Sequence, residues 1–297
     1  MNIYYVDGEF APEDRAAIPV NDLGIIRGYG VFDFMRTYNM RPFFLEEHIR
    51  RLETSARLIE IPMPRTRREI YGITMETLSR NRGHVAEAAI RIVITGGMSP
   101  DGITPGNASR LLVMVTPHHP YPAEWYRDGV AVVTVPDERY LPGAKTTNYI
   151  PAILALSRAR RQGAVESIYI DRNHRLLEGT TSNLFAFIGD RLATPGLSVL
   201  PGITRKVVLG LAGMEFQVEV RDIHMDEVRM MDEIFLTSSN KEVLPVVSMD
   251  GLPVGGGIPG PRTRRIMERF FAYTREYGEG NRGAGADAGV IQDYGTL

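Results

Sequence analysis

Residues 167–190, SIYIDRNHRLLEGTTSNLFAFIGD, decide the fold of the second half of the chain. Two short runs rich in branched and aromatic residues, Ser167–Ile170 and Asn183–Ile188, predict strands. A turn signal follows each run, at Arg172-Asn173 and at Gly189-Asp190. Strands this short and this closely spaced, antiparallel in look, favour a barrel-like domain over a doubly wound sheet.

The same pattern continues on both sides of this stretch. We predict strands at Ala131–Val135 and Glu233–Thr237, and helices at Tyr149–Gln162 and Thr204–Ala212. Residues 129–275 are therefore assigned to a larger, barrel-like domain.

The N-terminal part of the chain alternates strands with helices. From Leu45 to Ile59, apolar residues recur at steps of three and four, which predicts an amphipathic helix that ends before Pro62. The other predicted elements are a helix at Arg67–Arg80 and strands at Asn2–Asp7, Val31–Tyr38, Ala88–Thr95 and Leu111–Thr116. Residues 1–117 are predicted to form a small α/β domain.

Two segments are predicted to lie outside these domains. The run Pro117-His118-His119-Pro120-Tyr121-Pro122 indicates an interdomain linker, which we place at residues 118–128. The last stretch is rich in glycine among small polar residues, so residues 276–297 are predicted to be a disordered tail.

The composition excludes several classes of function. The chain has 297 residues, 43% hydrophobic and 24% charged, which is typical of a globular protein. A net charge of −2 argues against nucleic acid as a partner. Without cysteine there are no disulfides, thiolate nucleophiles or cysteine metal sites, and His118 and His119 lack nearby carboxylates, so we expect no metal. No apolar run approaches the length of a membrane span and no secretory signal is visible, so a cytoplasmic enzyme is expected.

Four places in the sequence could carry chemistry, although each also has a plain structural interpretation. Lys145 in LPGAKTTNY could be a solvated surface lysine, and Glu178 in LLEGTTSNLF could cap the next element. Gly202-Ile203-Thr204 opens a helix whose first N–H groups could receive a phosphate, or Thr204 could be a simple N-cap. Arg50 could be a bidentate cation for the same phosphate, or a residue on the solvated face of its helix.

Together these segments resemble the class IV aminotransferases, which are fold-type IV enzymes that use pyridoxal 5′-phosphate (PLP). The resemblance runs in order from about Asp7 to about Arg264, nearly the whole chain. It rests on the motifs Tyr29-Gly30-Val31-Phe32, Phe44-Leu45 with Arg50-Arg51-Leu52, Lys145 with Asn148-Tyr149, Glu178-Gly179 with Ser182-Asn183, Thr194-Pro195, Gly202-Ile203-Thr204-Arg205, and TSSNKEVLPV around Ser239.

The resemblance implies both a fold and a set of roles. The fold is α/β with two domains, PLP lies between them, and members of the family are usually homodimers. Lys145 is the Schiff-base lysine and the proton shuttle, Glu178 partners the pyridine nitrogen, and Tyr149 partners the 3-oxygen. The phosphate is held by Arg50, Ile203, Thr204 and Ser239, with Asn240 adjacent.

The expected reaction is transfer of an amino group between an amino acid and a 2-oxo acid, and three readings of the substrate remain open. The first is a D-amino acid with 2-oxoglutarate or pyruvate, in which Arg27 and Arg91 grip the α-carboxylate beside Tyr29 and Phe34. The second is a branched-chain L-amino acid, although such enzymes carry a tyrosine where this chain has Ala89 and a glycine where it has Phe34. The third is a lyase acting on aminodeoxychorismate.

Two points weigh on the first reading. The usual D-amino acid enzymes carry an Arg-x-His loop where this chain has Gly96-Gly97-Met98. Arg91 could also be structural and pair with a nearby acid such as Asp33.

Overall fold

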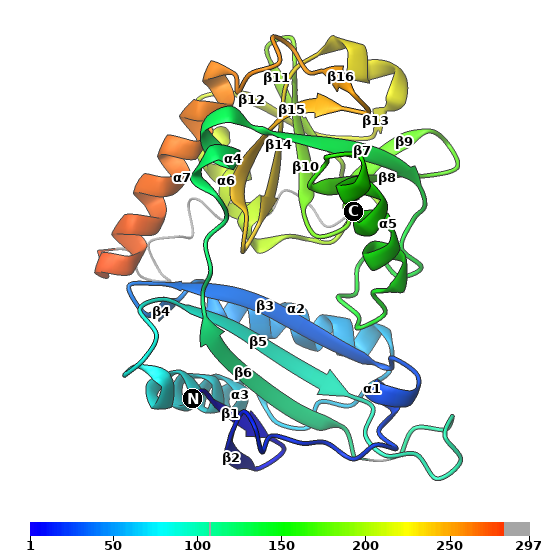
Figure 1. The fold of residues 1–297 in the computed structure, drawn as a ribbon, viewed down its shortest axis with the longest axis vertical. Helices are drawn as coiled ribbons and strands as arrows, with labels where there is room; N and C mark the ends of the chain where they lie inside the picture. Colours follow the sequence, from blue (N-terminus) through cyan, green and yellow to red (C-terminus); the bar gives the residue numbers. More distant parts are fainter. Residues whose placement is uncertain (107, 282–297) are drawn as a thin grey trace. The chain divides into compact units, whose positions relative to one another are not determined.

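The computed structural model describes residues 1–106 and 108–281, which fall into two compact units (Figure 1). The first unit consists of Met1–His119 together with Gly143–Tyr149, and the second of Pro120–Pro142 and the chain from Ile150 onward. The predicted small N-terminal domain, residues 1–117, lies wholly within the first unit. The short segment from Gly143 to Tyr149, which contains Lys145, is an addition to that unit that we did not predict.

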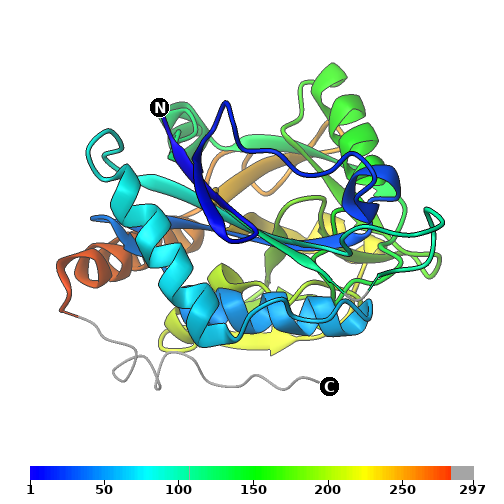
Figure 2. The ribbon, with the colours of Figure 1, turned by 90° about the horizontal axis from the view of Figure 1, so that it is seen from below.

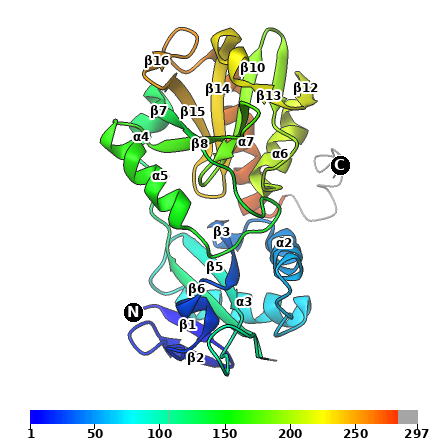
Figure 3. The same ribbon diagram turned by 90° about the vertical axis from the view of Figure 1, so that its right-hand side faces the viewer.

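The first unit is built on a six-stranded antiparallel sheet in the order β2-β1-β6-β5-β3-β4. Its strands are β1 (Ile3–Val6), β2 (Glu9–Pro12), β3 (Gly30–Tyr38), β4 (Arg41–Pro42), β5 (Ala88–Thr95) and β6 (Arg110–Pro117). Its helices are α1 (Leu23–Ile26), α2 (Leu45–Leu58) and α3 (Arg67–Asn81). Figures 2 and 3 show α2 and α3 on the same side of this sheet.

Alternate residues of β3 point to opposite faces of the sheet, as the period of a strand requires. Val31 and Met35 join the apolar core that α2 and α3 cover, together with Ile90 and Ile92 of β5. Phe32, Phe34 and Arg36 lie on the other face of the strand. This second face is the one that carries the candidate active site.

The second unit contains a ten-stranded sheet in the order β12-β11-β10-β14-β15-β7-β8-β9-β13, with β16 paired to β15. Its strands are β7 (Val130–Pro136), β8 (Glu166–Ile170), β9 (Arg175–Gly179), β10 (Asn183–Ile188), β11 (Arg191–Thr194), β12 (Gln217–Val220), β13 (Ile223–His224), β14 (Met231–Ser238), β15 (Glu242–Met249) and β16 (Leu252–Pro253). A bridge between Gly179 and Ser182 brings β9 back to β10, and these strands surround one apolar core. The predicted fold class, α/β with a barrel-like second part, is confirmed.

Two details of the second sheet differ from the prediction. β7 pairs in parallel with both β8 and β15, and β11 pairs in parallel with β12, so the sheet is not wholly antiparallel. Parallel neighbours need a crossover, and α5 (Ile150–Arg161) lies between β7 and β8 in the chain. A helix was predicted at Tyr149–Gln162 but was not identified as a crossover. The parallel pairings were therefore not predicted.

Two helices of the second unit occupy parts of the chain that were predicted to be the linker and the tail. They are α4 (Ala123–Asp128), α5, α6 (Ile203–Ala212), the 3-10 helix η1 (Met225–Met230) and α7 (Pro261–Glu279). Half of the predicted linker is therefore α4, whose Trp125 and Tyr126 pack against the barrel core. Residues 276–279 of the predicted tail complete α7, in which Gly278 is buried, and residues 282–297 lie outside the described residues.

Among residues 1–106 and 108–281, no helix combines the length and the apolar character that crossing a bilayer demands.

Candidate active site

Lys145 is attached to the first sheet through its main chain. Its N–H donates to Ser55 Oγ at 3.0 Å, and its carbonyl accepts from the Phe32 N–H at 2.9 Å. A bridge between Val31 and Thr146 continues this pairing along β3. Ser55 is fully buried on α2, so the main chain of Lys145 is held by both a strand and a helix.

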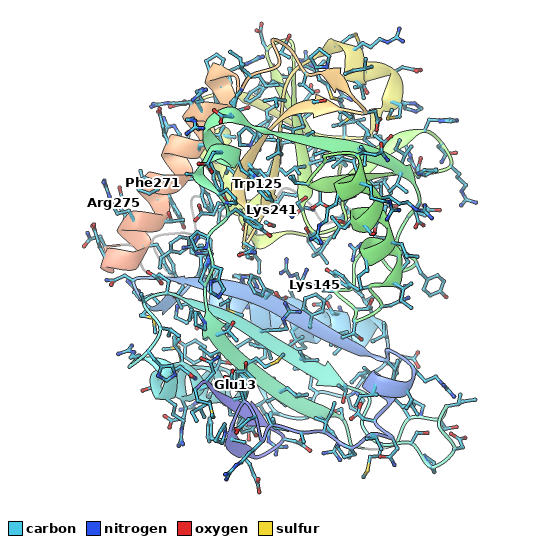
Figure 4. The ribbon with its side chains drawn as sticks, viewed as in Figure 1. Glu13, Trp125, Lys145, Lys241, Phe271 and Arg275 are labelled. Atoms are coloured by element: carbon cyan, nitrogen blue, oxygen red, sulfur yellow. The ribbon has the colours of Figure 1, made fainter. Side chains whose placement is uncertain are left out.

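The side chain of Lys145 lies on the face of β3 that the helices leave uncovered (Figure 4). Its Nζ is 4.8 Å from the centre of the Phe32 ring. The Tyr149 ring meets the Phe32 ring edge to face, with centroids 5.4 Å apart. The Arg91 guanidinium lies 5.3 Å from the Phe32 ring and 5.6 Å from the Phe34 ring. Thus Lys145, Tyr149, Phe34 and Arg91 of the predicted set come together around Phe32.

Arg91 has no acidic partner in the part of the chain that the structure describes. It faces Phe34 across the β3–β5 ladder, and its side chain is exposed. Asp33 points to the opposite face, where it accepts from Arg51 Nε at 2.9 Å and Nη2 at 2.7 Å. The alternative in which Arg91 pairs with Asp33 is therefore wrong, because successive residues of a strand alternate between faces.

Asp33 is the centre of a buried charged cluster beneath this face. Besides Arg51, the His48 ring contacts it through Nδ1 at 2.7 Å. Burial alone would raise the pKa of the Asp33 carboxyl, but Arg51 and His48 outweigh burial and hold this pKa well below its usual value. Burial also lowers the pKa of His48, which favours the neutral ring. His48 Nε2 is buried without a hydrogen-bond partner among the described residues.

Arg50, the predicted phosphate ligand, lies on the outer face of α2. Its side chain is 48% exposed and pairs with Glu46 and Glu47 of the same helix. The next residue, Arg51, is 10% exposed and lies in the Asp33 cluster. The signal that separates them is the helical period, because His48, Arg51 and Ser55 recur at steps of three and four along the inward side.

The two other predicted substrate residues, Arg27 and Tyr29, each donate to a main-chain carbonyl. The Arg27 side chain is exposed at the end of α1, and it donates to the carbonyl of Ile26 at 2.9 Å. The Tyr29 hydroxyl donates to the carbonyl of Ile59 at 2.6 Å, and its ring packs against the core under the helices. Tyr29 therefore anchors the end of α2 to β3.

In the second unit, Glu178 is buried at the end of β9 and its carboxylate is held from several sides. Oε1 accepts from Arg139 Nε at 2.9 Å and Nη2 at 2.6 Å. Oε2 accepts from Asn183 Nδ2 at 2.9 Å and from the Leu200 N–H at 3.0 Å. These bonds fix the orientation of the carboxylate, and Arg139 is a partner that the sequence analysis missed.

The start of α6 lies beside this carboxylate. Its N-cap is Gly202, so Thr204 is not the N-cap, and no side chain among the described residues caps the helix. A Cβ on Gly202 would collide with the Asn183 amide, which itself bonds Glu178. Ile203 and Thr204 are buried in the first turn, where helix N–H groups lack internal partners. This arrangement suits a bound anion.

Ser239 and Asn240 form the turn between β14 and β15. Asn240 Nδ2 donates to the Tyr121 hydroxyl at 3.1 Å. The following residue, Lys241, is buried and donates to Glu166 Oε2 at 2.8 Å and to the Thr181 hydroxyl. Neither Lys241 nor Glu166 was among the predicted residues.

A search of residues 1–106 and 108–281 for three or more histidine or acidic side chains placed to hold a metal ion finds no such group. The functional groups available in both units are amines, guanidinium groups, carboxylates, hydroxyls and helix N–H groups. This donor set suits an organic anion.

Known proteins resemble the chain along nearly its whole length. Residues 30–249 match the family model described as amino-transferase class IV. A putative branched-chain-amino-acid aminotransferase of Methanocaldococcus jannaschii is 32% identical over 284 residues, which cover 92% of this chain and 97% of the relative. A D-alanine aminotransferase of Staphylococcus aureus is 30% identical over 285 residues, which cover 93% and 99%.

Solved structures are similar over the same extent. The branched-chain amino acid aminotransferase of Escherichia coli has a TM-score of 0.85 at 29% identity, and the match covers 91% of this chain and 94% of that chain. Another branched-chain amino acid aminotransferase, solved with pyridoxamine 5′-phosphate, has the same TM-score at 27% identity and covers 96% of each chain. Sequence and fold therefore point to the same family.

The Asp33 cluster yields a prediction about stability. In Asp33→Asn, Arg51 loses its buried counter-charge, so we expect a loss of about 3–5 kcal/mol in the free energy of unfolding near neutral pH. Because the folded-state pKa of Asp33 is lowered, its contribution is fully present above the unfolded value of about 4 and is lost as pH falls from there through the folded-state value. Urea denaturation from pH 7 to pH 3 should therefore show the gap between the two proteins narrowing by about 1 kcal/mol at the acid end.

Asp7→Asn is the matched control, since Asp7 pairs with Arg110 at a partly exposed position of the same unit. Its effect should stay below about 1 kcal/mol. A gap between wild type and Asp33→Asn that stays constant down to pH 3 would contradict the assignment.

Proposed function

The chain belongs to the class IV aminotransferases, whose cofactor is PLP, and from this membership we propose that it transfers an amino group between a D-amino acid and a 2-oxo acid such as 2-oxoglutarate or pyruvate. The observation that carries the choice of enantiomer is Arg91. This guanidinium shares a sheet face with Lys145 and has no acidic partner among the described residues.

The residues present fit the functional groups of PLP one by one. The amine of Lys145 matches the aldehyde, and the phenol of Tyr149 matches the 3-oxygen. The oriented carboxylate of Glu178 matches the pyridine nitrogen. The uncapped start of α6, at Ile203 and Thr204, matches the phosphate. We propose that each of these residues serves the cofactor through the group that it matches.

Ser239 and Asn240 would complete the phosphate site. For the cation of this site we propose Arg51 in place of Arg50. Arg50 is engaged by Glu46 and Glu47 on the helix surface. Arg51 lies on the inward side of α2, and the serine that holds the Lys145 main chain also donates to the Arg51 carbonyl at 2.8 Å. Arg51 is therefore the better candidate.

When bound, PLP supplies an aldehyde that captures the amino group and a ring that accepts the electrons released at the substrate α-carbon. Lys145 Nζ is the group that would hold this aldehyde. With substrate in the site, the same amine would move the proton between the substrate α-carbon and the C4′ carbon. A lysine suits this double task because its long side chain moves while its main chain is held by Ser55 and Phe32.

Glu178 and Arg91 would each stabilise a charge of opposite sign, Glu178 on the cofactor ring and Arg91 on the substrate. The carboxylate of Glu178 keeps the proton on the ring nitrogen, which strengthens the electron sink. Arg91 would pair with the α-carboxylate of the substrate in a bidentate manner, and Arg27, exposed at the end of α1, is the second candidate cation. The aromatic ring of Phe34 beside Arg91 would border the bound substrate.

The alternative is a branched-chain L-amino acid aminotransferase. Relatives with both names are similar at comparable identity, 32% and 30%, so identity does not choose between them. The apolar residues Phe34, Ala89 and Val93 share the Arg91 face and would suit an aliphatic side chain. A lyase acting on aminodeoxychorismate has no specific observation in its favour.

We also propose a homodimer. Three large apolar side chains of α5, Ile150, Ile153 and Leu154, are more than half exposed. A cluster of exposed apolar side chains on one helix is typical of a surface that another chain covers.

The first test concerns Lys145. Purified protein should be yellow, and borohydride should fix the cofactor covalently on Lys145, as peptide mass spectrometry would detect. Lys145→Ala should lose both the covalent label and transamination. A variant that still transaminates at close to the wild-type rate would refute the assignment.

The second test concerns Glu178. Glu178→Gln keeps the size but removes the charge, so α-proton removal should slow by ~10²-fold or more in single turnover. The cofactor should stay bound, since the phosphate is gripped elsewhere. If the single-turnover rate is unchanged, Glu178 has no part in the mechanism.

The third test concerns the enantiomer. D-Alanine or D-glutamate should convert the cofactor to its amine form faster than L-leucine does. Arg91→Ala should weaken D-substrates by roughly ten- to a hundredfold, mainly in KM, because a charge-assisted bidentate contact is lost. Arg91→Lys keeps the charge but not the forked geometry of the guanidinium. Its KM for D-substrates should fall between those of wild type and Arg91→Ala. A faster half-reaction with L-leucine than with every D-amino acid would favour the branched-chain alternative.

A further inference from the structure

A buried ion pair in the second unit lies outside the roles assigned so far. Glu166, at the start of β8, is fully buried, and Lys241, after the β14–β15 turn, is 5% exposed. The Lys241 ammonium donates to Glu166 Oε2 at 2.8 Å. The two residues are 75 positions apart in the sequence. Figure 4 labels Lys241 at the end of the sheet where Trp125 also lies.

Glu166 is saturated with donors from one short segment. Three consecutive hydroxyls, Thr180, Thr181 and Ser182, donate to its carboxylate, Thr181 at 2.7 Å and Ser182 at 3.1 Å. The Lys241 ammonium also donates to the Thr181 hydroxyl. Gly179 has no side chain because a Cβ there would collide with Glu166 and Ser182.

The pair therefore joins two segments that carry proposed cofactor ligands. One is the segment from Glu178 to Asn183, whose ends are bonded to each other. The other is the turn of Ser239 and Asn240, because Lys241 is the next residue. On its far side the turn is held by Tyr121, which accepts from Asn240 and stacks on Trp125 with ring centroids 4.8 Å apart.

We propose that Glu166 and Lys241 are positioning residues that hold the Ser239–Asn240 turn in the geometry that grips the phosphate of PLP. This inference rests on the proposed function. It gives the buried pair a role that stability alone does not, since a buried ion pair is often no more stabilising than apolar residues of the same volume. Neither residue needs to touch the cofactor.

A positioning role predicts a different effect on cofactor binding from either simple charge attraction or simple stabilisation of the fold. If Lys241 attracted the phosphate by charge alone, removing the negative charge of Glu166 would strengthen PLP binding. If the pair only stabilised the fold, its loss would weaken binding of PLP and of pyridoxal, which lacks the phosphate, to the same extent. If it positions the turn, Glu166→Gln weakens PLP and leaves pyridoxal unchanged.

The experiment measures the Kd of PLP and of pyridoxal for the cofactor-stripped full chain. Trp125 is the single tryptophan of the chain and stacks next to the turn, so its fluorescence reports binding. The variants are Glu166→Gln and the double variant Glu166→Gln/Lys241→Met, which buries no unpaired charge and keeps the test valid if the single variant does not fold. Arg262→Met is the control, since it breaks the pair with buried Glu233 at the opposite end of β14.

We expect both variants to weaken PLP by about tenfold or more and pyridoxal by less than about twofold. Arg262→Met should lower Tm without changing the ratio of the two constants. Tighter PLP binding in Glu166→Gln, or an unchanged ratio in both variants, overturns the proposal. A wild-type protein that binds PLP and pyridoxal equally also overturns it, whereas absence of borohydride labelling at Lys145 in wild type is the separate failure of the proposed function.

Discussion

The main chain of Lys145 is hydrogen-bonded on both sides, to Ser55 of α2 and to Phe32 of β3, and the role proposed for Lys145 depends on this attachment. A reactive amine must have a defined origin and enough reach to serve more than one carbon. Holding the peptide while leaving a four-carbon side chain above the sheet meets both requirements. Tyr149 and Arg91 gather around the same Phe32 ring, so one aromatic side chain organises the face on which the amine works.

Buried carboxylates recur next to each functional segment, and each has its own cation. Asp33 is paired with Arg51, Glu178 with Arg139, and Glu166 with Lys241. An unpaired charge in the interior would be costly, so every acid that orients a functional group brings a partner with it. Each pairing neutralises the charge of the acid locally and fixes the orientation of its carboxylate.

The sequence was informative wherever periodicity or a motif carried the signal. The period of the apolar residues located α2, and the strand patterns located β3, β5, β6 and β10 close to their observed bounds. The helix α7 was not predicted, although Ile266, Phe270 and Tyr273 recur at helical steps, and only its last residues fell within the predicted tail.

What lay beyond prediction were contacts between distant segments. Arg50 and Arg51 are an exception, because the helical period of α2 already separates the exposed residue from the buried one. The pairs Glu178–Arg139 and Glu166–Lys241 are 39 and 75 residues apart, and no local pattern announces such a partner. Long-range pairing is decided by the register of the second sheet.

The alternation along β3 has a consequence for how this protein can change. Val31 and Met35 lie in the apolar core and Asp33 in the charged cluster, while Phe34 and Arg36, facing Arg91 and Ala89 of β5, lie on the face that also carries the Lys145 side chain. If the proposed site is right, substitutions on the Lys145 face of β3 would change ligand choice and spare the core, whereas an insertion of one residue would exchange the two faces at once. A new substrate preference could therefore arise by single substitutions on the β3–β5 ladder, but hardly by changes in the length of its strands.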